Sequence, residues 1–168
     1  MTSPTSLQPQ WATTEGLAFP LGATWIEEEQ AWNFALYSKH AERVTLLLYA
    51  ESDLAHTLYT YTFDFLKNKT GRIWHCRVPF AAMRDAVYYA YRIEGPPPAG
   101  RFEWHCFDPD KILLDPYAKS VFFPAALDRL AAMRPGSNAG KAPLGVIRGD
   151  RNAFDWEDDA RSEEHTSE

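Results

Sequence analysis

The sequence predicts an all-β domain, an antiparallel sandwich of two sheets followed by a short helical and loop extension. Three observations support this fold class. Short segments in which apolar and polar residues alternate recur between residues 32 and 94, and clusters of turn-forming residues separate them. The hydrophobic share of 45% and the aromatic share of 14% are sufficient for a packed core. Such strands and turn intervals are typical of an immunoglobulin-like sandwich.

The first expected strands lie on either side of a polar turn at residues 38–43. In the first, Trp32, Phe34 and Leu36 occupy every second position, which is the period of a half-buried strand. Residues 44–49 are almost continuously apolar, as in a strand that is buried on both faces.

Aromatic residues at every second position mark the next expected strand, residues 57–66. They are Tyr59, Tyr61, Phe63 and Phe65. Residues 68–71 have the chemistry of a turn, so residues 73–78 are expected to return as the partner strand. A further strand over 88–94 ends at a run of Gly and Pro.

Beyond residue 100 the regular alternation stops. Residues 111–118 form a compact apolar segment in which Asp115, placed before a proline, is expected to fix a turn through its side chain. Residues 125–134 are flanked by prolines and predict a short helix. The residues expected on its inward face are Leu127, Leu130 and Ala131. From Gly136 onward the composition is typical of a loop.

Charge and hydropathy limit the expected partners. The 168 residues carry a formal net charge of −6, which lacks the basic footprint needed to bind nucleic acid or anionic lipid. No apolar run approaches the roughly 20 residues that span a bilayer, and the first twenty residues do not form a signal peptide. We therefore expect a cytoplasmic protein without nucleic-acid or membrane partners. Neutral polar ligands such as sugars remain open.

Two cysteines, Cys76 and Cys106, do not make a disulfide framework and are expected to be small buried apolar groups. Each follows a histidine, His75 or His105. Neighbours on a strand point to opposite faces, so such a pair cannot share one metal ion. We expect no metal site and no other cofactor.

Four segments, in order, resemble the N-terminal region of bacterial glycogen-debranching enzymes and isoamylases of glycoside hydrolase family 13. The first comprises Phe19-Pro-Leu-Gly-Ala-Thr-Trp25, Trp32-Asn-Phe-Ala-Leu-Tyr-Ser38 and Ala41-Glu-Arg-Val44, and the second Tyr89-Ala-Tyr-Arg-Ile-Glu-Gly-Pro96 with Gly100-Arg-Phe102. The third and most specific is Lys111-Ile-Leu-Leu-Asp-Pro-Tyr-Ala-Lys119. The fourth is Ala142-Pro-Leu-Gly-Val146 with Phe154-Asp-Trp-Glu-Asp-Asp159.

The resemblance implies a family-48 carbohydrate-binding module, a β-sandwich that precedes a catalytic (β/α)8 barrel. That family hydrolyses α-1,6 branch linkages in glycogen and related α-glucans, and its catalytic carboxylates lie in the barrel. The implied partners are therefore an α-glucan and the protein's own barrel. No catalytic residue is assigned to this chain, which is expected to be inactive alone.

The resemblance also suggests a division of the chain. We expect a flexible lead-in over residues 1–17, the sandwich over 18–120, and a helix and linker over 121–160 toward a barrel that the sequence does not contain. Residues 161–168 do not resemble the family. They are similar to the translation of a sequencing-library adapter and are expected to be an artefact.

A glycosidase needs two carboxylates, roughly 5–5.5 Å apart in retaining enzymes and 6.5–9.5 Å apart in inverting ones. The available acidic residues are Asp108, Asp110 and Asp115 and the cluster Asp155, Glu157, Asp158 and Asp159. We expect all of them to be structural or solvated, because they lie in turn and loop sequence.

Three tryptophans are candidates for carbohydrate binding: Trp32, Trp74 and Trp104. A flat indole face can lie against the apolar C–H face of a glucose ring. The competing interpretation is core packing, since sandwiches bury such residues. Glycogen-binding members of the module family carry a paired-tryptophan platform behind a Gly-Thr-Phe-Asn type loop, and this sequence lacks that loop.

Two functions from different classes follow. The first is the non-catalytic N-terminal domain of a debranching hydrolase that acts on α-1,6-glucosidic branches. The alternative is a free-standing α-glucan-binding module. A third possibility is that the isolated chain associates, because surface that the barrel would normally cover is exposed.

Overall fold

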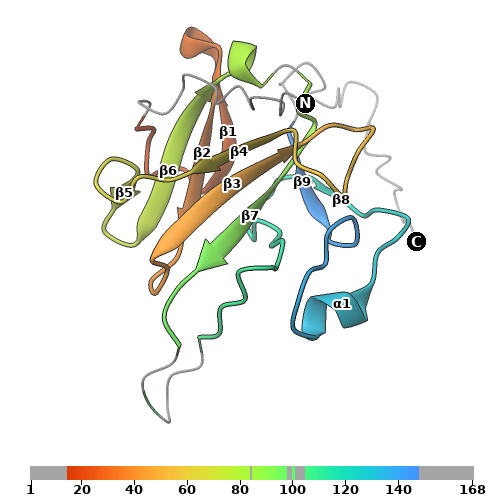
Figure 1. Ribbon diagram of the computed structural model, residues 1–168. Helices are drawn as coiled ribbons and strands as arrows, with labels where there is room; N and C mark the ends of the chain where they lie inside the picture. Colours follow the sequence, from red (N-terminus) through yellow and green to blue (C-terminus); the bar gives the residue numbers. More distant parts are fainter. Residues whose placement is uncertain (1–14, 84, 98–99, 101–104, 148–168) are drawn as a thin grey trace, which may run out of the picture.

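The computed structural model describes residues 15–83, 85–97, 100 and 105–147, and these residues form two antiparallel sheets (Figure 1). The four-stranded sheet has the order β1-β2-β6-β5 and the five-stranded sheet the order β4-β3-β7-β9-β8. The strands are β1 (Gly22–Ile26), β2 (Ala31–Tyr37), β3 (Arg43–Tyr49), β4 (Tyr59–Thr62), β5 (Lys69–Thr70), β6 (Ile73–Pro79), β7 (Tyr88–Glu94), β8 (Val121–Phe122) and β9 (Leu144–Val146). Two 3-10 turns, η1 (Glu27–Glu29) and η2 (Phe80–Ala82), and one helix, α1 (Arg129–Met133), complete the described elements. The predicted all-β sandwich is confirmed.

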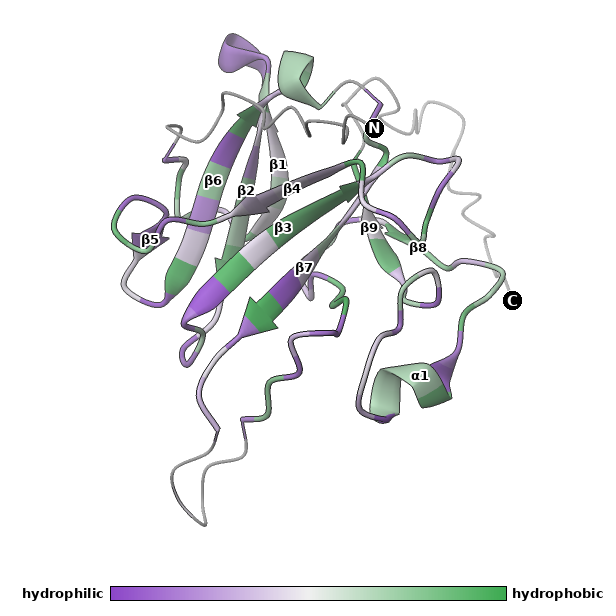
Figure 2. Ribbon diagram, in the orientation of Figure 1, coloured by the Kyte–Doolittle hydropathy of each residue, from purple (hydrophilic) through white to green (hydrophobic). Residues whose placement is uncertain are grey.

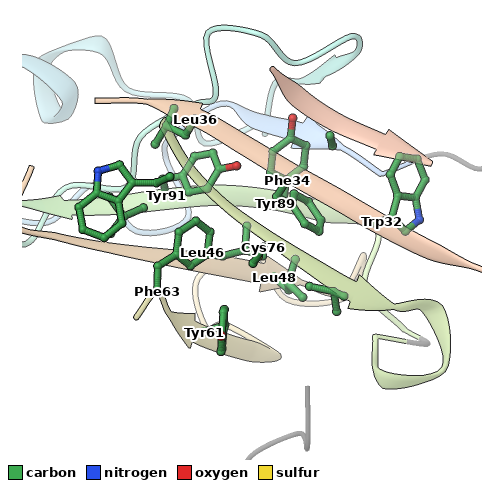
Figure 3. Packing of buried hydrophobic residues seen from close by; sticks show 14 of the residues in the cluster. Trp32, Phe34, Leu36, Leu46, Leu48, Tyr61, Phe63, Cys76, Tyr89 and Tyr91 are labelled. Atoms are coloured by element: carbon green, nitrogen blue, oxygen red, sulfur yellow. The ribbon is translucent and has the colours of Figure 1, made fainter. Parts of the chain in front are cut away.

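The core lies between the two sheets (Figure 3). The four-stranded sheet contributes Phe34, Trp74 and Cys76, and the five-stranded sheet contributes Leu46 and Tyr91, all of them fully buried. The inward residues alternate along each strand, as Figure 2 shows for β6, where hydrophobic and hydrophilic positions follow one another. This is the two-residue period of a strand.

At β3 the five-stranded sheet is buried on its outer face as well, as the continuous apolar run of that strand predicts. Leu47 and Tyr49 point away from the sandwich core and are 0% exposed. Ile112 and Ala142 cover them. Both come from residues 105–147, which follow β7 and are called the extension below. The extension therefore contributes to the core and is not a loose linker.

Two pairings differ from the sequence-based expectation. The strand expected over 57–66 ends at Thr62, and β4 pairs with β3 in the five-stranded sheet. Its expected partner, β6, pairs with β2 and β5 in the other sheet. After β4 the chain crosses between the sheets, and Phe63 and Phe65 make edge contacts with Tyr91 and Trp74. The alternating aromatic residues therefore belong partly to β4 and partly to the segment that crosses to the other sheet. The prediction of one long strand was wrong.

The extension also differs from expectation. The helix covers Arg129–Met133 only, because the Asp128 side chain accepts hydrogen bonds from the N–H groups of Leu130 and Ala131 and so begins the helix there. Leu127 and Leu130, expected to face inward, are 39% and 55% exposed.

Residues 144–146, expected to be loop, form strand β9, which pairs with β7 and β8. The five-stranded sheet therefore continues beyond residue 120, where the sandwich was expected to end. In the described part of the chain, no helix has the length and apolar character needed to cross a membrane.

Candidate functional site

The structure places two of the three predicted carbohydrate-binding tryptophans in the core. Trp32 is 5% exposed and Trp74 is 0% exposed, so neither presents an open ring face. Trp104 lies outside the described residues. A glucan role for Trp32 or Trp74 stays a prediction that has no exposed ring face to support it.

One end of the four-stranded sheet carries an aromatic cluster that includes Trp32. Trp25 pairs with Trp32 across β1 and β2, and the centroids of their rings are 5.6 Å apart. The Phe80 ring stands nearly perpendicular to Trp25 at 6.0 Å. Phe80 is 49% exposed and Trp25 partly buried. Trp32 is thus the buried part of the cluster, Trp25 is partly buried, and Phe80 is half exposed.

Polar groups of η1 hold this cluster in place. The indole N–H of Trp25 donates to Glu27 Oε2, and Gln30 Nε2 donates to Glu27 Oε1 at 3.0 Å. Gln30 has a φ of 48°, in the left-handed region that is uncommon outside glycine. Its carbonyl oxygen accepts the Phe80 N–H at 2.9 Å. η1 and η2 are therefore joined at one end of the sandwich, where Figure 1 shows the two short coils side by side.

The outer face of the four-stranded sheet is covered by residues 15–17. The Asn33 side chain exchanges two hydrogen bonds with the backbone of Leu17, and His75 Nδ1 lies 2.7 Å from the carbonyl oxygen of Glu15. A Cβ at Gly16 would lie 2.6 Å from the backbone of Cys76, so only glycine fits against β6. This sheet face is not available to a flat ligand.

His75 and Cys76 lie on opposite faces of β6, as predicted. His75 contacts Thr70 and Glu15, whereas Cys76 is in the core, where burial raises the pKa of its thiol. Cys106 was expected to be buried but is exposed. Within the described ranges, no group of three or more His, Cys, Asp or Glu side chains could hold a metal ion.

Buried polar side chains tie the first residues of the extension to the segment around α1. Lys111 is 8% exposed, and its ammonium donates to the carbonyl oxygens of Ala131, at 2.6 Å, and Gly136, at 2.5 Å, and to that of Arg134. The Asn138 side chain bonds both backbone groups of Ile112. The residues around α1 are thereby fixed although their own apolar side chains are not buried.

The extension presents exposed apolar side chains on its outer surface: Leu113, Tyr117, Phe123, Leu127, Leu130 and Met133. An open pocket of about 290 Å³ lies beside them, between the end of β7 and α1. Ile93, Phe107 and Met133 contribute to its walls, with Asp108 and Arg134 as charged residues. Where exposed apolar side chains form a contiguous patch on a soluble domain, they mark a contact site for a protein or a ligand.

Two acidic residues of the extension, Asp108 and Asp115, accept hydrogen bonds from its backbone. Bonds from the N–H groups of Gly136 and Asp110 lower the pKa of Asp108. Asp115 is 1% exposed and accepts the Tyr117 N–H at 2.8 Å, which confirms its predicted role in a turn. The acidic cluster over 155–159 lies outside the described residues.

A family profile described as carbohydrate-binding module 48 (isoamylase N-terminal domain) matches residues 20–118. The chain belongs to this family. The resemblance of the four sequence segments is thereby confirmed.

Curated relatives of this carbohydrate-binding module 48 protein are much longer than the chain. Isoamylase 3, chloroplastic, of Oryza sativa subsp. japonica is 36% identical over 88% of this chain and 18% of its own length. A glycogen debranching enzyme of Cronobacter sakazakii is 38% identical over 76% of this chain and, again, 18% of its own length. The module thus spans about a fifth of these relatives.

Solved structures share the fold of the module at low sequence identity. The catalytic module of a glycogen-degrading pneumococcal virulence factor superposes with a TM-score of 0.54 and 22% identity, over 81% of this chain and 17% of that one. A pullulanase of group B Streptococcus in complex with maltotetraose superposes with a TM-score of 0.53 and 17% identity, over 79% of this chain and 15% of that one.

Sequence reasoning did not identify Trp25 or Phe80 as candidates. Trp25 stands in the first segment of the family resemblance, but its pairing with Trp32 depends on the β1–β2 register. Phe80 joins it only because β6 runs beside β2 and ends next to η1. No local sequence signal brings these two residues together.

Proposed function

We propose that this chain is the non-catalytic N-terminal module of a hydrolase that debranches α-glucans at α-1,6 linkages. The observation that carries the proposal is the match of residues 20–118 to the isoamylase N-terminal domain, in a chain that spans 18% of its isoamylase and debranching-enzyme relatives. Hydrolysis then belongs to a catalytic domain elsewhere in the longer protein.

The exposed apolar side chains of the extension support a contact with that catalytic domain. Leu130 and Met133 are 55% and 80% exposed although α1 itself is firmly anchored through Lys111 and Asp128. Burial of such side chains contributes roughly 25 cal/mol per Å² of apolar surface removed from water. We infer that the module braces the catalytic domain through this surface.

The test compares the 168-residue chain with the full-length enzyme in the release of reducing ends from glycogen or amylopectin. Only the longer protein is expected to hydrolyse branches. Hydrolysis by the chain alone, or none by the full-length enzyme on any branched α-glucan, would contradict the proposal.

A pair of substitutions tests the brace. Leu130→Asp with Met133→Asp is expected to lower the thermal midpoint of the full-length enzyme by several degrees and to leave that of the chain alone unchanged. Leu66→Asp is the matched control, because Leu66 is 88% exposed on the segment between β4 and β5. If both changes lowered the thermal midpoint of the full-length enzyme equally, the inference that the module braces the catalytic domain would be contradicted.

A free-standing α-glucan-binding module is the second candidate function, and the half-exposed Phe80 ring beside the partly buried Trp25 favours it. If this second function is correct, the chain binds glycogen. No longer protein that contains the chain is then expected to hydrolyse branches. The comparison of chain and full-length enzyme therefore separates the two functions.

A further inference from the structure

We propose that the pocket between the end of β7 and α1 is a docking site for a segment of this same chain, residues 154–159. These residues, Phe-Asp-Trp-Glu-Asp-Asp, follow the last strand and lie outside the described ranges. The pocket would hold the ring of Trp156, and the carboxylates around it would lie against a cationic wall. This docking does not require the longer protein to be a hydrolase.

The walls of the pocket suit one large aromatic side chain. Its volume is about 290 Å³, at the lower limit of the roughly 300–1,000 Å³ that is typical of small-molecule sites. Ile93 and Phe107 are partly buried and pack against the core, which fixes this part of the wall. Cys106 and Arg134, both exposed, also line the pocket. An indole ring that enters is removed from water, and large aromatic side chains gain most from such burial.

The charges of the pocket favour an acidic occupant. Among the described residues that line it, Lys111 and Arg134 carry positive charge and Asp108 carries negative charge. Both carboxylate oxygens of Asp108 already accept backbone N–H groups, at 3.0 and 2.9 Å. Arg134 forms no ion pair with another residue of the described ranges. Residues 154–159 contain four carboxylates and no cation, so they complement this guanidinium.

The chain is long enough to bring Trp156 to the pocket. Strand β9 ends at Val146, and the N–H of Ile147 donates to the carbonyl oxygen of Val87 at 2.8 Å, just before β7 begins. Ile93 in the pocket wall is six residues further along, about 20 Å in a strand that rises about 3.3 Å per residue. The nine residues from Ile147 to Trp156 span up to about 30 Å. The segment can therefore cover this distance without being fully stretched.

A docked segment would also determine where the chain leaves the extension. Leu113 and Met133 line the pocket and belong to the exposed apolar surface assigned above to the catalytic domain. In Figure 1 the end of β7 and α1 both lie in the lower half of the molecule. If the proposed function is correct, the segment would lead the chain onward beside the surface that contacts that domain.

Disulfide trapping in the 168-residue chain tests this occupant. Cys106 is an exposed thiol in the pocket wall, whereas Cys76 is fully buried. The Glu157→Cys variant keeps both aromatic residues of the segment, and Thr166→Cys is the matched control further along the same tail. With oxidised glutathione, we expect Glu157→Cys to form an intramolecular bond to Cys106 at least about tenfold faster than the control, because a docked segment raises the effective concentration of the two thiols. An undocked tail would give similar rates, since closure entropy depends only weakly on loop length.

Two further changes in the Glu157→Cys chain separate the ring from the charge. Trp156→Ala should lower the rate of bond formation to that of the Thr166→Cys control, because the side chain that enters the pocket is removed. Arg134→Gln should lower the rate by a smaller factor. High salt should do the same, because it screens exposed charges. Peptide mapping by mass spectrometry identifies which cysteines are joined.

Three results would overturn the docking. They are equal rates in Glu157→Cys and Thr166→Cys, an unchanged rate after Trp156→Ala, or disulfide-linked dimers in place of the intramolecular bond, which would make a second copy the occupant. Circular dichroism confirms that each variant is folded before rates are compared. Branch hydrolysis by the full-length enzyme is measured separately, so failure of the docking and failure of the proposed function remain distinguishable.

Discussion

At the scale of single residues, buried polar side chains hold the two ends of the described chain against the sandwich. Asn33 and His75 bond residues 15–17 to the outer face of one sheet. Lys111 and Asn138 bond the segment around α1 to residues 111–112, and the next residue, Leu113, exchanges backbone hydrogen bonds with Tyr91 of the other sheet. Asn33, His75, Lys111 and Asn138 are each less than 9% exposed. A buried polar group without a partner costs about 1–3 kcal/mol, so these bonds specify where the covering segments lie.

Asp115 is a buried residue with a charge that depends on pH. Its Oδ2 accepts the Tyr89 hydroxyl at 2.9 Å, and its Oδ1 accepts the Tyr117 N–H. Burial raises the pKa of this carboxyl above its ordinary value, although both hydrogen bonds act in the opposite direction. The folded protein therefore keeps a proton on Asp115 at a higher pH than the unfolded chain does. The stability from this group is present below the unfolded pKa of about 3.9 and is lost as pH rises through the folded pKa.

Asp115→Asn is expected to remove this loss of stability at rising pH. The amide keeps an oxygen that accepts the Tyr117 N–H, and it stays neutral at every pH. Urea unfolding of both proteins between about pH 3.5 and pH 7 measures the effect. The free energy of unfolding of the variant, relative to wild type, should rise across that range. Asp53, Asp108 and Asp128 have lowered pKa values and shift stability the other way, but they are common to both proteins. A constant difference at all pH values would show that Asp115 does not titrate in this way.

At the scale of elements, strand pairing is where sequence patterns failed. The alternation over 57–66 predicted a hairpin with β6, whereas β4 and β6 lie in different sheets. Strand β9 is short and contains a glycine, so it carries no local strand signal, yet it pairs with β7. Its neighbour Tyr89 explains the glycine: a Cβ at Gly145 would lie 2.3 Å from the Tyr89 ring.

Gly145→Ala is therefore expected to destabilise the protein. Tyr89 is 1% exposed and packed in the core, so its ring cannot move away without displacing other side chains. Overpacking of this kind costs about 1–3 kcal/mol in the free energy of unfolding, measured by urea denaturation. Gly100→Ala is the control, because nothing lies within 4 Å of a Cβ there, and it should change stability by less than about 0.5 kcal/mol. Similar effects at both positions would contradict the close contact of β9 with Tyr89.

At the scale of the whole molecule, two sheets enclose one core, and the extension covers the outer face of the larger sheet. Leu47, Tyr49 and Ala90 are fully buried only because Ile112, Ala142 and β9 lie over or beside them. The extension in turn presents its own apolar side chains outward. These outward side chains are the ones proposed above to contact a catalytic domain.

A chain that ends at residue 120 is expected to fold poorly or to associate. It lacks β8 and β9 and exposes the apolar outer face of β3 and β7. Size-exclusion chromatography should show larger species for residues 1–120 than for the 168-residue chain at the same concentration. A monomeric 1–120 chain with an unchanged thermal midpoint would mean that the extension contributes little to the fold.

The all-β class, the bounds of β7, the two-sided burial of β3 and the family were all predictable from the order of the amino acids. Each of these depends on local periodicity or on motifs that are contiguous in the chain. Four features became known only from the folded chain: which strands share a sheet, the place of β9, the burial of Trp32 and Trp74, and the contact of Trp25 with Phe80. These features depend on register and on contacts between residues far apart in the sequence. The two-residue period of a strand shows that a side chain faces one side of a sheet, but only the packed neighbours determine whether that side is core or surface.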